Sequence, residues 1–322
     1  MKKVLIKVSM LCLCAGMVFT TSCSKKDDDA ASPASESQQT AGSDDTRAQN
    51  ESDAGSSDVE TAMASNSSTM RTSADTIMGA TVDASNAASQ KKLVITYDGT
   101  SNVGGRRRSG SITAQLTSGT SWSSQNAVIT YTYNNYKATR VSDGKSITLN
   151  GSATLKNTSG GSISTLTIAS TDTRTRSIRA SNLRVTFDDG TQRTWSFAKK
   201  RVISCQSIGA DYTVKTYGDT TISSPSSHGD ATHHVAAWGT TRFGTTFYTV
   251  IPDNDPITWI SANCTTAPAS GSLSVEGLTK TLTIKYGVDS NGAPVTTATC
   301  AYGIQLSWLD GTGSTTTAVV FY

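Results

Sequence analysis

The three histidines of the chain lie close together in one polar segment, where imidazole groups could bind a metal or transfer protons near neutral pH. They are His228, His233 and His234, with Asp230 between them. Imidazole and carboxylate groups are ordinary zinc ligands, so this segment is a candidate metal site. The spacing matches no zinc motif, and the neighbouring residues are Ser, Thr and Gly. A solvent-exposed linker is therefore the favoured interpretation.

Acidic residues offer little sign of catalysis beyond residue 90. That region has one glutamate, Glu276, and twelve aspartates, most of them beside Gly or Asn in turn-like stretches. A glycosidase needs two facing carboxylates, and the sequence selects no pair. Asp253 and Asp255 form the closest acidic group, which suits either a calcium ion or a turn between two prolines. No nucleophile elbow or phosphate-binding glycine loop is present, so we expect a non-enzymatic protein without a cofactor.

The six cysteines divide into two groups. Cys12, Cys14 and Cys23 lie in or just after an N-terminal apolar run, whereas Cys205, Cys264 and Cys300 lie in the main body. An exported chain meets an oxidising compartment, and there we expect a disulfide between Cys264 and Cys300. Cys205 would then be a small buried thiol. A three-cysteine metal site is the alternative, but no closely spaced pair supports it.

The first 22 residues have the three parts of an export signal. Lys2, Lys3 and Lys7 are followed by an apolar run over residues 8–19 and then by small residues up to Ser22. The run is too short to span a bilayer, which needs roughly 20 apolar residues. We therefore expect residues 1–22 to be a signal peptide.

The junction at Cys23 resembles the lipobox of bacterial lipoproteins, in which the cysteine is acylated and becomes the first residue. Thr20 stands where leucine is commonest, and ordinary secretion is the alternative because Thr20 and Ser22 also suit a signal peptidase. A charged run follows, and it resembles the surface-export signal of Bacteroidota lipoproteins: Lys25, Lys26, Asp27, Asp28 and Asp29. A solvated charge run is the simpler interpretation. The resemblance implies an outer-membrane lipoprotein exposed at the surface, with membrane lipid as its partner through Cys23.

Residues 23–90 have the composition of a disordered tether. They contain no aromatic residue, and their twelve acidic and four basic residues give a net charge of −8. Such a segment has little apolar surface to bury, so we expect an acidic coil with, at most, a weak helix over residues 59–78.

Beyond residue 90 the pattern changes to that of an all-β protein. Ile129, Tyr131 and Tyr133 alternate with threonines, as in half-buried antiparallel strands. Asp-Gly pairs at 98–99, 143–144, 189–190 and 310–311 predict hairpin turns. We expect a β-sandwich-like arrangement or an extended hairpin meander. A polar stretch after residue 216 suggests two units, 91–215 and 216–322.

The β-rich region is basic, with 21 Lys and Arg against 13 acidic residues. The concentrations are at 106–108, at Arg174, Arg176 and Arg179, and at 199–201. On a shared face they would attract anionic glycan or lipid phosphate, whereas on edge strands they would prevent aggregation. The five tryptophans could stack on sugars or pack in the core.

Three Thr-rich stretches, 105–113, 128–136 and 147–155, together with Cys264 and Cys300, resemble a group of uncharacterised Bacteroidota lipoproteins. The resemblance implies a surface location and an all-β fold, and it supplies no catalytic residues. We therefore expect a binding or structural role, with an extracellular glycan or an envelope protein as partner and no nucleic acid. The alternatives are a fimbrillin-like adhesin subunit that polymerises by strand exchange and a glycan-active enzyme.

Overall fold

The computed structural model describes residues 33–65, 77–168, 172–207, 211–219, 233–261, 267–295 and 300–322. The predicted signal peptide, Cys23 and the charged run at 25–29 lie outside these ranges and stay predictions. Among the described residues, no helix combines the length and the apolar character needed to cross a membrane.

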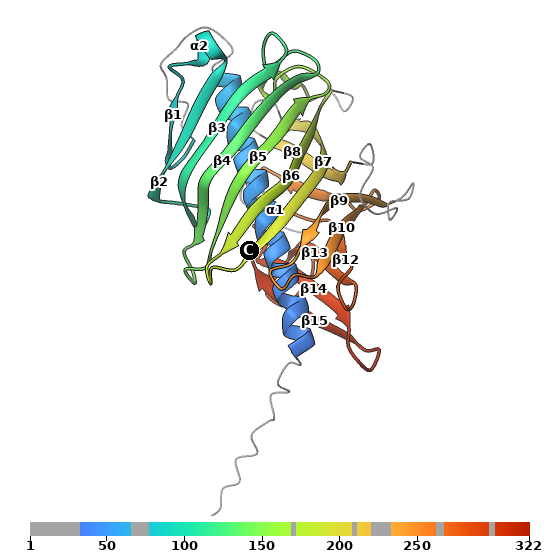
Figure 1. Ribbon diagram of the computed structural model, residues 1–322. Helices are drawn as coiled ribbons and strands as arrows, with labels where there is room; N and C mark the ends of the chain where they lie inside the picture. The colour runs from blue at the N-terminus through green and yellow to red at the C-terminus, as the bar shows by residue number, and fades with distance from the viewer. Residues whose placement is uncertain are drawn as a thin grey trace, which may run out of the picture.

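The fold is one antiparallel β-sheet curled around one long helix (Figure 1). All-β antiparallel structure is thus confirmed, and the strands follow one another mostly as hairpins, which is the meander arrangement. The strands are β1 (Ala80–Asp83), β2 (Lys92–Val103), β3 (Arg106–Ser118), β4 (Ala127–Arg140), β5 (Ser146–Asn157), β6 (Thr173–Phe187), β7 (Gln192–Ser207), β8 (Asp211–Gly218), β9 (His233–Thr240), β10 (Thr246–Pro252), β11 (Ile257–Ile260), β12 (Ser272–Glu276), β13 (Leu282–Val288), β14 (Gly303–Leu309) and β15 (Thr315–Phe321). Two short helices, α2 (Ala87–Gln90) and η1 (Ile163–Thr165), lie in connections.

The sheet continues across the predicted division between 215 and 216, which falls inside β8. β7 pairs with β8 along one part of its length and with β9 along another, where Trp195 faces Gly239 and Phe197 faces Ala237. From β9 the hydrogen-bonded order runs through β10, β12, β13 and β14 to β15. The two predicted units therefore share one sheet.

A row of bulges bends four neighbouring strands. The pairing register shifts at Gly110 on β3, at Asn135 on β4, at Gly151 on β5 and at Asn182 on β6, and all four have positive φ angles. A Cβ atom at Gly110 would lie 2.1 Å from the carbonyl oxygen of Asn135, so only glycine fits there. Bulges increase the local twist and bend of a strand, and this row curls the sheet.

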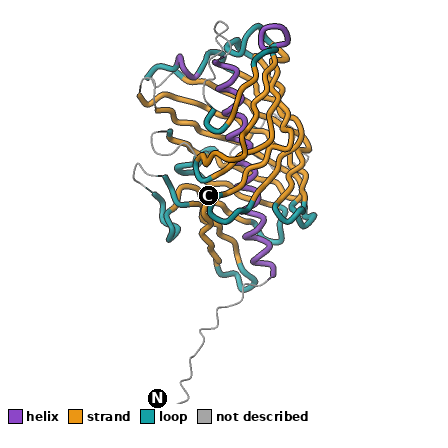
Figure 2. Tube along the Cα trace, turned by 90° about the vertical axis from the view of Figure 1, so that its left-hand side faces the viewer, coloured by secondary structure: helices purple, strands orange, loops and turns teal. Residues whose placement is uncertain are grey.

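The segment enclosed by the curled sheet is α1 (Pro33–Ser65), a helix of 33 residues (Figure 2). At 1.5 Å per residue it is about 50 Å long. The disordered tether predicted for residues 23–90 is therefore wrong over 33–65, and also over 77–90, which contains β1 and α2. The weak helix predicted for 59–78 overlaps only the last residues of α1. Composition argued for disorder because the segment alone has little to bury. The sheet supplies what the segment lacks, namely apolar partners and opposite charges.

The helix fits closely into the curled sheet at small residues. A Cβ atom on Gly55 would lie 2.9 Å from the ring of Tyr133. Ala48, Val59 and Ala62 of the helix join the same hydrophobic core as residues of β2 to β7. Small side chains thus let the helix approach the strands, and the larger polar side chains between them must find partners in the interior.

Candidate functional site: a basic sheet face occupied by an acidic helix

Strand alternation turns part of each basic cluster inward, toward α1. On β3, Arg106 is buried and Arg107 is exposed. On β7, Lys199 is fully buried and its neighbour Lys200 is exposed. Arg242, in the turn between β9 and β10, also points toward α1. We call these inward residues the basic face: Arg106, Arg108, Arg176, Arg193, Lys199, Arg201 and Arg242.

Carboxylates of α1 pair with every member of the basic face. Five acidic residues serve seven cations, and the pairs lie along the length of the helix. They are Asp44–Arg242 (2.6 Å), Asp45–Arg193 (3.3 Å), Glu51–Arg106 (2.6 Å), Glu51–Arg108 (3.1 Å), Asp53–Lys199 (3.0 Å), Asp53–Arg201 (2.7 Å) and Glu60–Arg176 (2.6 Å). The inward members of the basic clusters are thus neither solvated edge residues nor open anion sites, because the chain's own helix supplies their anions.

Glu51 lies between two arginines of β3. Burial alone would raise its pKa, but the guanidinium groups of Arg106 and Arg108 outweigh burial and hold the pKa below its usual value. The hydroxyl of Tyr136 also donates to this carboxylate, at 3.3 Å. Glu51 is therefore ionised inside the protein, which two hydrogen-bonded cations make tolerable.

Asp53 forms ion pairs with two cations of β7. Burial would raise its pKa, but the charges of Arg201 and Lys199 lower it overall. Burial lowers the pKa of Lys199, whose ammonium group also lies 5.6 Å from the ring centre of Trp195 and 5.3 Å from that of Phe197. Attraction between a cation and aromatic rings adds to the ion pair in this water-poor setting.

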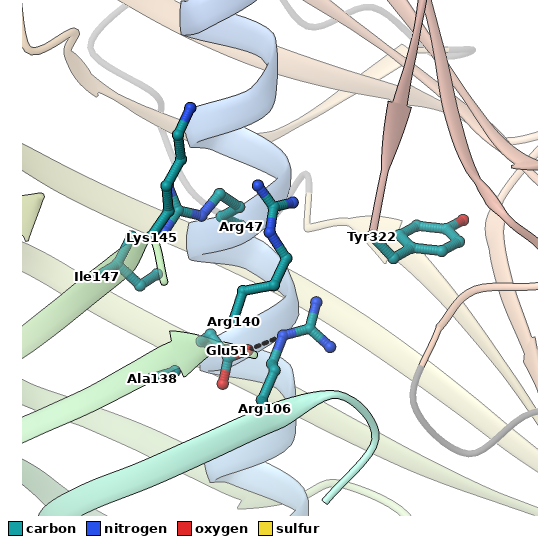
Figure 3. A pocket seen from close by; sticks show the side chains of 8 residues that line it. All are labelled: Arg47, Glu51, Arg106, Ala138, Arg140, Lys145, Ile147 and Tyr322. Atoms are coloured by element: carbon teal, nitrogen blue, oxygen red, sulfur yellow. Dashed lines mark ion pairs between the residues drawn. The ribbon is translucent and has the colours of Figure 1, made fainter. Parts of the chain in front are cut away.

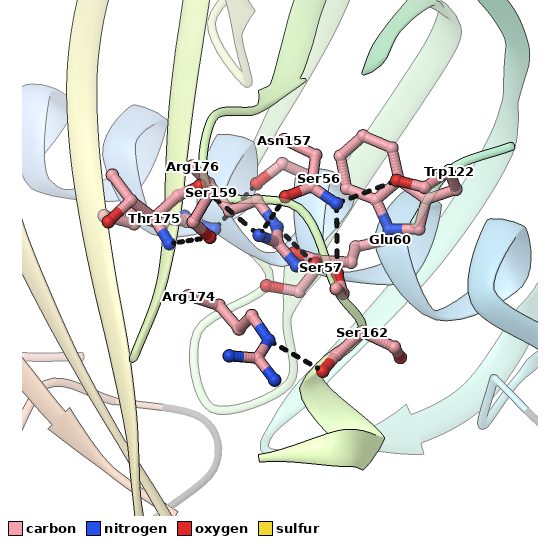
Figure 4. Close-up of polar contacts among 12 residues, drawn as sticks. Ser56, Ser57, Glu60, Trp122, Asn157, Ser159, Ser162, Arg174, Thr175 and Arg176 are labelled. Carbon is pink, nitrogen blue, oxygen red and sulfur yellow. Dashed lines mark hydrogen bonds and ion pairs between the residues drawn. The ribbon is translucent and has the colours of Figure 1, made fainter. Parts of the chain in front are cut away.

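Arg176 also has a fully buried side chain, and its contacts are drawn in Figure 4. Its Nε donates to Glu60 at 2.6 Å, and its Nη groups donate to the side chain of Asn157 and the carbonyl of Gly161. Its guanidinium lies 5.2 Å from the ring centre of Trp122. This network fastens the C-terminal part of α1 to β5, β6 and the loop between them.

Among the acidic residues of α1 whose side chains the structure describes, Asp58 is the one without an ion pair. The hydroxyl of Tyr97 donates to it at 2.7 Å. Burial raises the pKa of Asp58 to about 6, and the hydrogen bond from Tyr97 offsets part of that rise. The carboxyl group is therefore close to half protonated at about pH 6, so its contact with Tyr97 depends on pH in the mildly acidic range.

A small hollow remains beside the N-terminal half of α1 (Figure 3). Its lining combines α1, β3, the β4–β5 hairpin and the C-terminal residue: Arg47, Glu51, Arg106, Ala138, Arg140, Lys145, Ile147 and Tyr322. Four of these eight residues are basic and one is acidic. Three of the four cations have carboxylate partners, and the enclosed space has room for about one water molecule.

The residues predicted to bind metal are only partly brought together. His234 on β9 lies 2.9 Å from Asp253, which joins two segments that the sequence analysis treated separately. His233 is also on β9, while His228 and Asp230 lie outside the described residues. Within the described ranges, no group of three His, Cys, Asp or Glu side chains could hold a metal ion. The amide of Asp255 donates to the carbonyl of Pro252, as in a turn.

The structure tests the cysteine predictions only in part. Cys205 is buried on β7 beside Ile203 and Leu166, in agreement with its predicted burial. Cys264 lies outside the described residues, so the disulfide with Cys300 stays a prediction. Trp122, Trp195 and Trp308 are buried, which leaves Trp238 and Trp259 as the partly exposed tryptophans among the five.

Comparison with known proteins finds no family model, no curated protein and no solved structure that matches this chain. The function is therefore inferred from the residues and their geometry.

The helix carboxylates are the functional residues that the sequence analysis missed. The signal was present, because the acidic segment has a net charge of −8 and the β-rich region has a net charge of +8. The opposite and equal charges would have suggested that the two parts bind each other.

Proposed function

We propose that the chain is an envelope lipoprotein, attached to the outer membrane through an acylated Cys23, and that its β-rich body has a non-enzymatic binding or structural role. The N-terminal pattern supports the anchor, since two or three acyl chains give stable attachment to a bilayer. The surface-export resemblance at 25–29 supports exposure at the cell surface.

The observation that carries a structural role is the position of α1 in the fold. The helix begins at Pro33, ten residues after Cys23, and the sheet encloses it. Ten extended residues span at most about 36 Å, so a lipidated Cys23 would hold the sheet close to the membrane surface. A force applied through the anchor would act on α1, which ion pairs connect to β3, β6 and β7. This suits a protein that must stay attached under load.

The charge arrangement favours binding or structure over catalysis. Five carboxylates of α1 are occupied by cations of the basic face, and a catalytic acid or base must be able to reach its substrate. The rival hypothesis of a glycan-active enzyme assigns the chemistry to Asp253, which lies 2.9 Å from His234. Sugar release by the full chain that is lost in Asp253→Asn would support that rival.

Substitution of Cys23 tests the anchor. The Cys23→Ser chain should move from the membrane fraction to the soluble fraction, and mass spectrometry of the wild-type N-terminal peptide should show acylation. Ser24→Ala is the matched control and should remain in the membrane. A Cys23→Ser chain that remains membrane-bound would refute the proposal. Detergent-resistant ladders of the mature protein would instead favour a fimbrillin-like subunit.

A further inference from the structure

β15 is the last strand of the sheet and has a neighbour on one side only (Figure 1). Among the described strands it pairs with β14 alone, residue by residue and without a shift of register. In an antiparallel pair, alternate residues direct both their N–H and C=O groups toward the neighbouring strand, and the residues between them direct theirs away. β15 therefore presents a row of main-chain groups to the outside of the sheet.

The odd-numbered residues of β15 carry these outward groups. Just before the strand, the carbonyl of Ser314 accepts a hydrogen bond from the amide of Asp310 at 2.8 Å. Just after the strand, the amide of Tyr322 donates to the carbonyl of Tyr302 at 3.3 Å. Because both ends of the ladder are bonded through even-numbered residues of this segment, the residues at 316, 318 and 320 face β14. The residues at 315, 317, 319 and 321 face away from it.

The edge of β15 lacks the features with which proteins usually protect a free strand, namely short length, charges, prolines and bulges. Its seven residues, Thr-Thr-Thr-Ala-Val-Val-Phe, include no charged residue and no proline, and Thr315, Thr317 and Phe321 are exposed. The other end strands differ. β1 has four residues and ends at the exposed Asp83, and β11 has four residues and is bridged by Ser270. β15 is thus the one end strand of the described sheet that is both long and uncharged.

We propose that β15 pairs in antiparallel orientation with β15 of a second copy of this chain, which joins two sheets edge to edge in a dimer. Among the described residues, one outward main-chain group is already hydrogen-bonded, since Nη1 of Arg140 donates to the carbonyl of Phe321 at 3.0 Å. The pairing therefore uses residues 315, 317 and 319, and the two-fold axis passes between Thr317 and Thr317 of the second copy. Thr315 then faces Val319 of the second copy, and each opposed pair exchanges two main-chain hydrogen bonds.

A second copy suits this edge because the strand complements itself. Threonines that face each other across antiparallel strands attract, and no like charges meet because β15 carries none. A contact of β15 with β1 of another copy would instead leave one free edge at each end and continue into a filament. The four residues of β1 and the carboxylate of Asp83 disfavour that contact. The pairing of β15 with itself uses the same edge on both copies, so it stops at two.

Thr317→Cys tests the pairing in the mature Cys23→Ser chain, which needs no lipid anchor. Opposed hydrogen-bonded residues have Cα atoms about 5.5 Å apart, a distance that a disulfide spans. Mild oxidation with glutathione should give a disulfide-linked dimer of Thr317→Cys on non-reducing gels, and the parent chain should give none. Thr283→Cys is the matched control and should also give none. Thr283 is exposed on the same face of the sheet, because it faces Ser307 and Ser307 faces Thr317, but β13 has neighbours on both sides.

Thr317→Lys should weaken the dimer without loss of the fold, because it places two ammonium groups opposite each other across the axis. Sedimentation velocity, over a concentration series up to about 1 mM, should show a Kd of the dimer that is raised about tenfold or more. Thr283→Lys is the control and should dimerise as the parent chain does. Both variants should keep the Tm of the parent chain, because both side chains are exposed.

Three results would overturn the proposal. The first is that Thr317→Cys gives no more linked dimer than Thr283→Cys. The second is that Thr317→Lys and the parent chain sediment alike. The third is that the parent chain forms a series of species larger than a dimer, which would indicate a head-to-tail contact instead.

Discussion

The ion pair between Glu60 and Arg176 offers a sharp test of how the helix is held. Glu60→Gln removes the charge of the carboxylate and keeps its shape. Arg176 then remains fully buried, with neutral acceptors on Asn157, Gly161 and Thr175 and without an opposite charge. The substitution therefore isolates the electrostatic part of the contact.

The expected cost follows from the burial of Arg176. Removal of one partner of a buried pair typically destabilises a protein by about 3–5 kcal/mol, because the remaining charge is uncompensated. We expect the low end, about 3 kcal/mol, since glutamine can still accept the hydrogen bond from Nε. Each kcal/mol lowers the Tm of a protein of this size class by about 2–4 °C, so the shift should be about 6–12 °C.

Urea unfolding of the Cys23→Ser mature chain measures the change. The double variant Glu60→Gln with Arg176→Met should lose about 2–3 kcal/mol less than the sum of the two single variants, because methionine leaves no unpaired charge. Asp83→Asn, an exposed acidic residue on β1, is the control and should not change the unfolding midpoint. Additive single effects, or a Glu60→Gln chain as stable as the control, would refute the reasoning.

Two further predictions concern the same helix. The pKa of Asp58 is raised to about 6, so the folded state binds its proton more tightly than the unfolded state does, and ionisation opposes folding as the pH rises from about 4 to 6. Asp58→Asn should therefore stabilise the protein by about 1–2 kcal/mol at pH 7.5 and have little effect at pH 4. Urea unfolding at both pH values measures this. Equal effects at both pH values would contradict the raised pKa of Asp58. Gly55→Val would place methyl groups against Tyr133 and should lower the stability by about 1–3 kcal/mol, whereas an unchanged Tm would show that the helix does not approach β4 this closely.

The strands could be predicted from the sequence because their signals are local. Ile129, Tyr131 and Tyr133 are buried as their alternation indicated. The Asp-Gly pairs at 143–144, 189–190 and 310–311 lie in turns between consecutive strands. The hairpin turn predicted at 98–99 is wrong, because this pair lies at an irregularity inside β2. Residues 104–105 form the turn to β3 instead.

The helix could not be predicted from local patterns because its stability comes from distant residues. Asp44 is 198 positions from its partner Arg242, and Asp45 is 148 positions from Arg193. Rules for disorder treat a segment by its own hydrophobicity and charge, and by these measures residues 33–65 cannot pack. The positive charge of the β-rich region stabilises the helix by pairing with its carboxylates. From the sequence alone, that charge indicated a surface feature.

Hydrogen–deuterium exchange over residues 38–63 of the full mature chain would show whether the acidic segment is a helix enclosed by the sheet. These amides should exchange as slowly as those of β4 and β5. Complete exchange at the earliest time point, with β4 and β5 still protected, would contradict an enclosed helix.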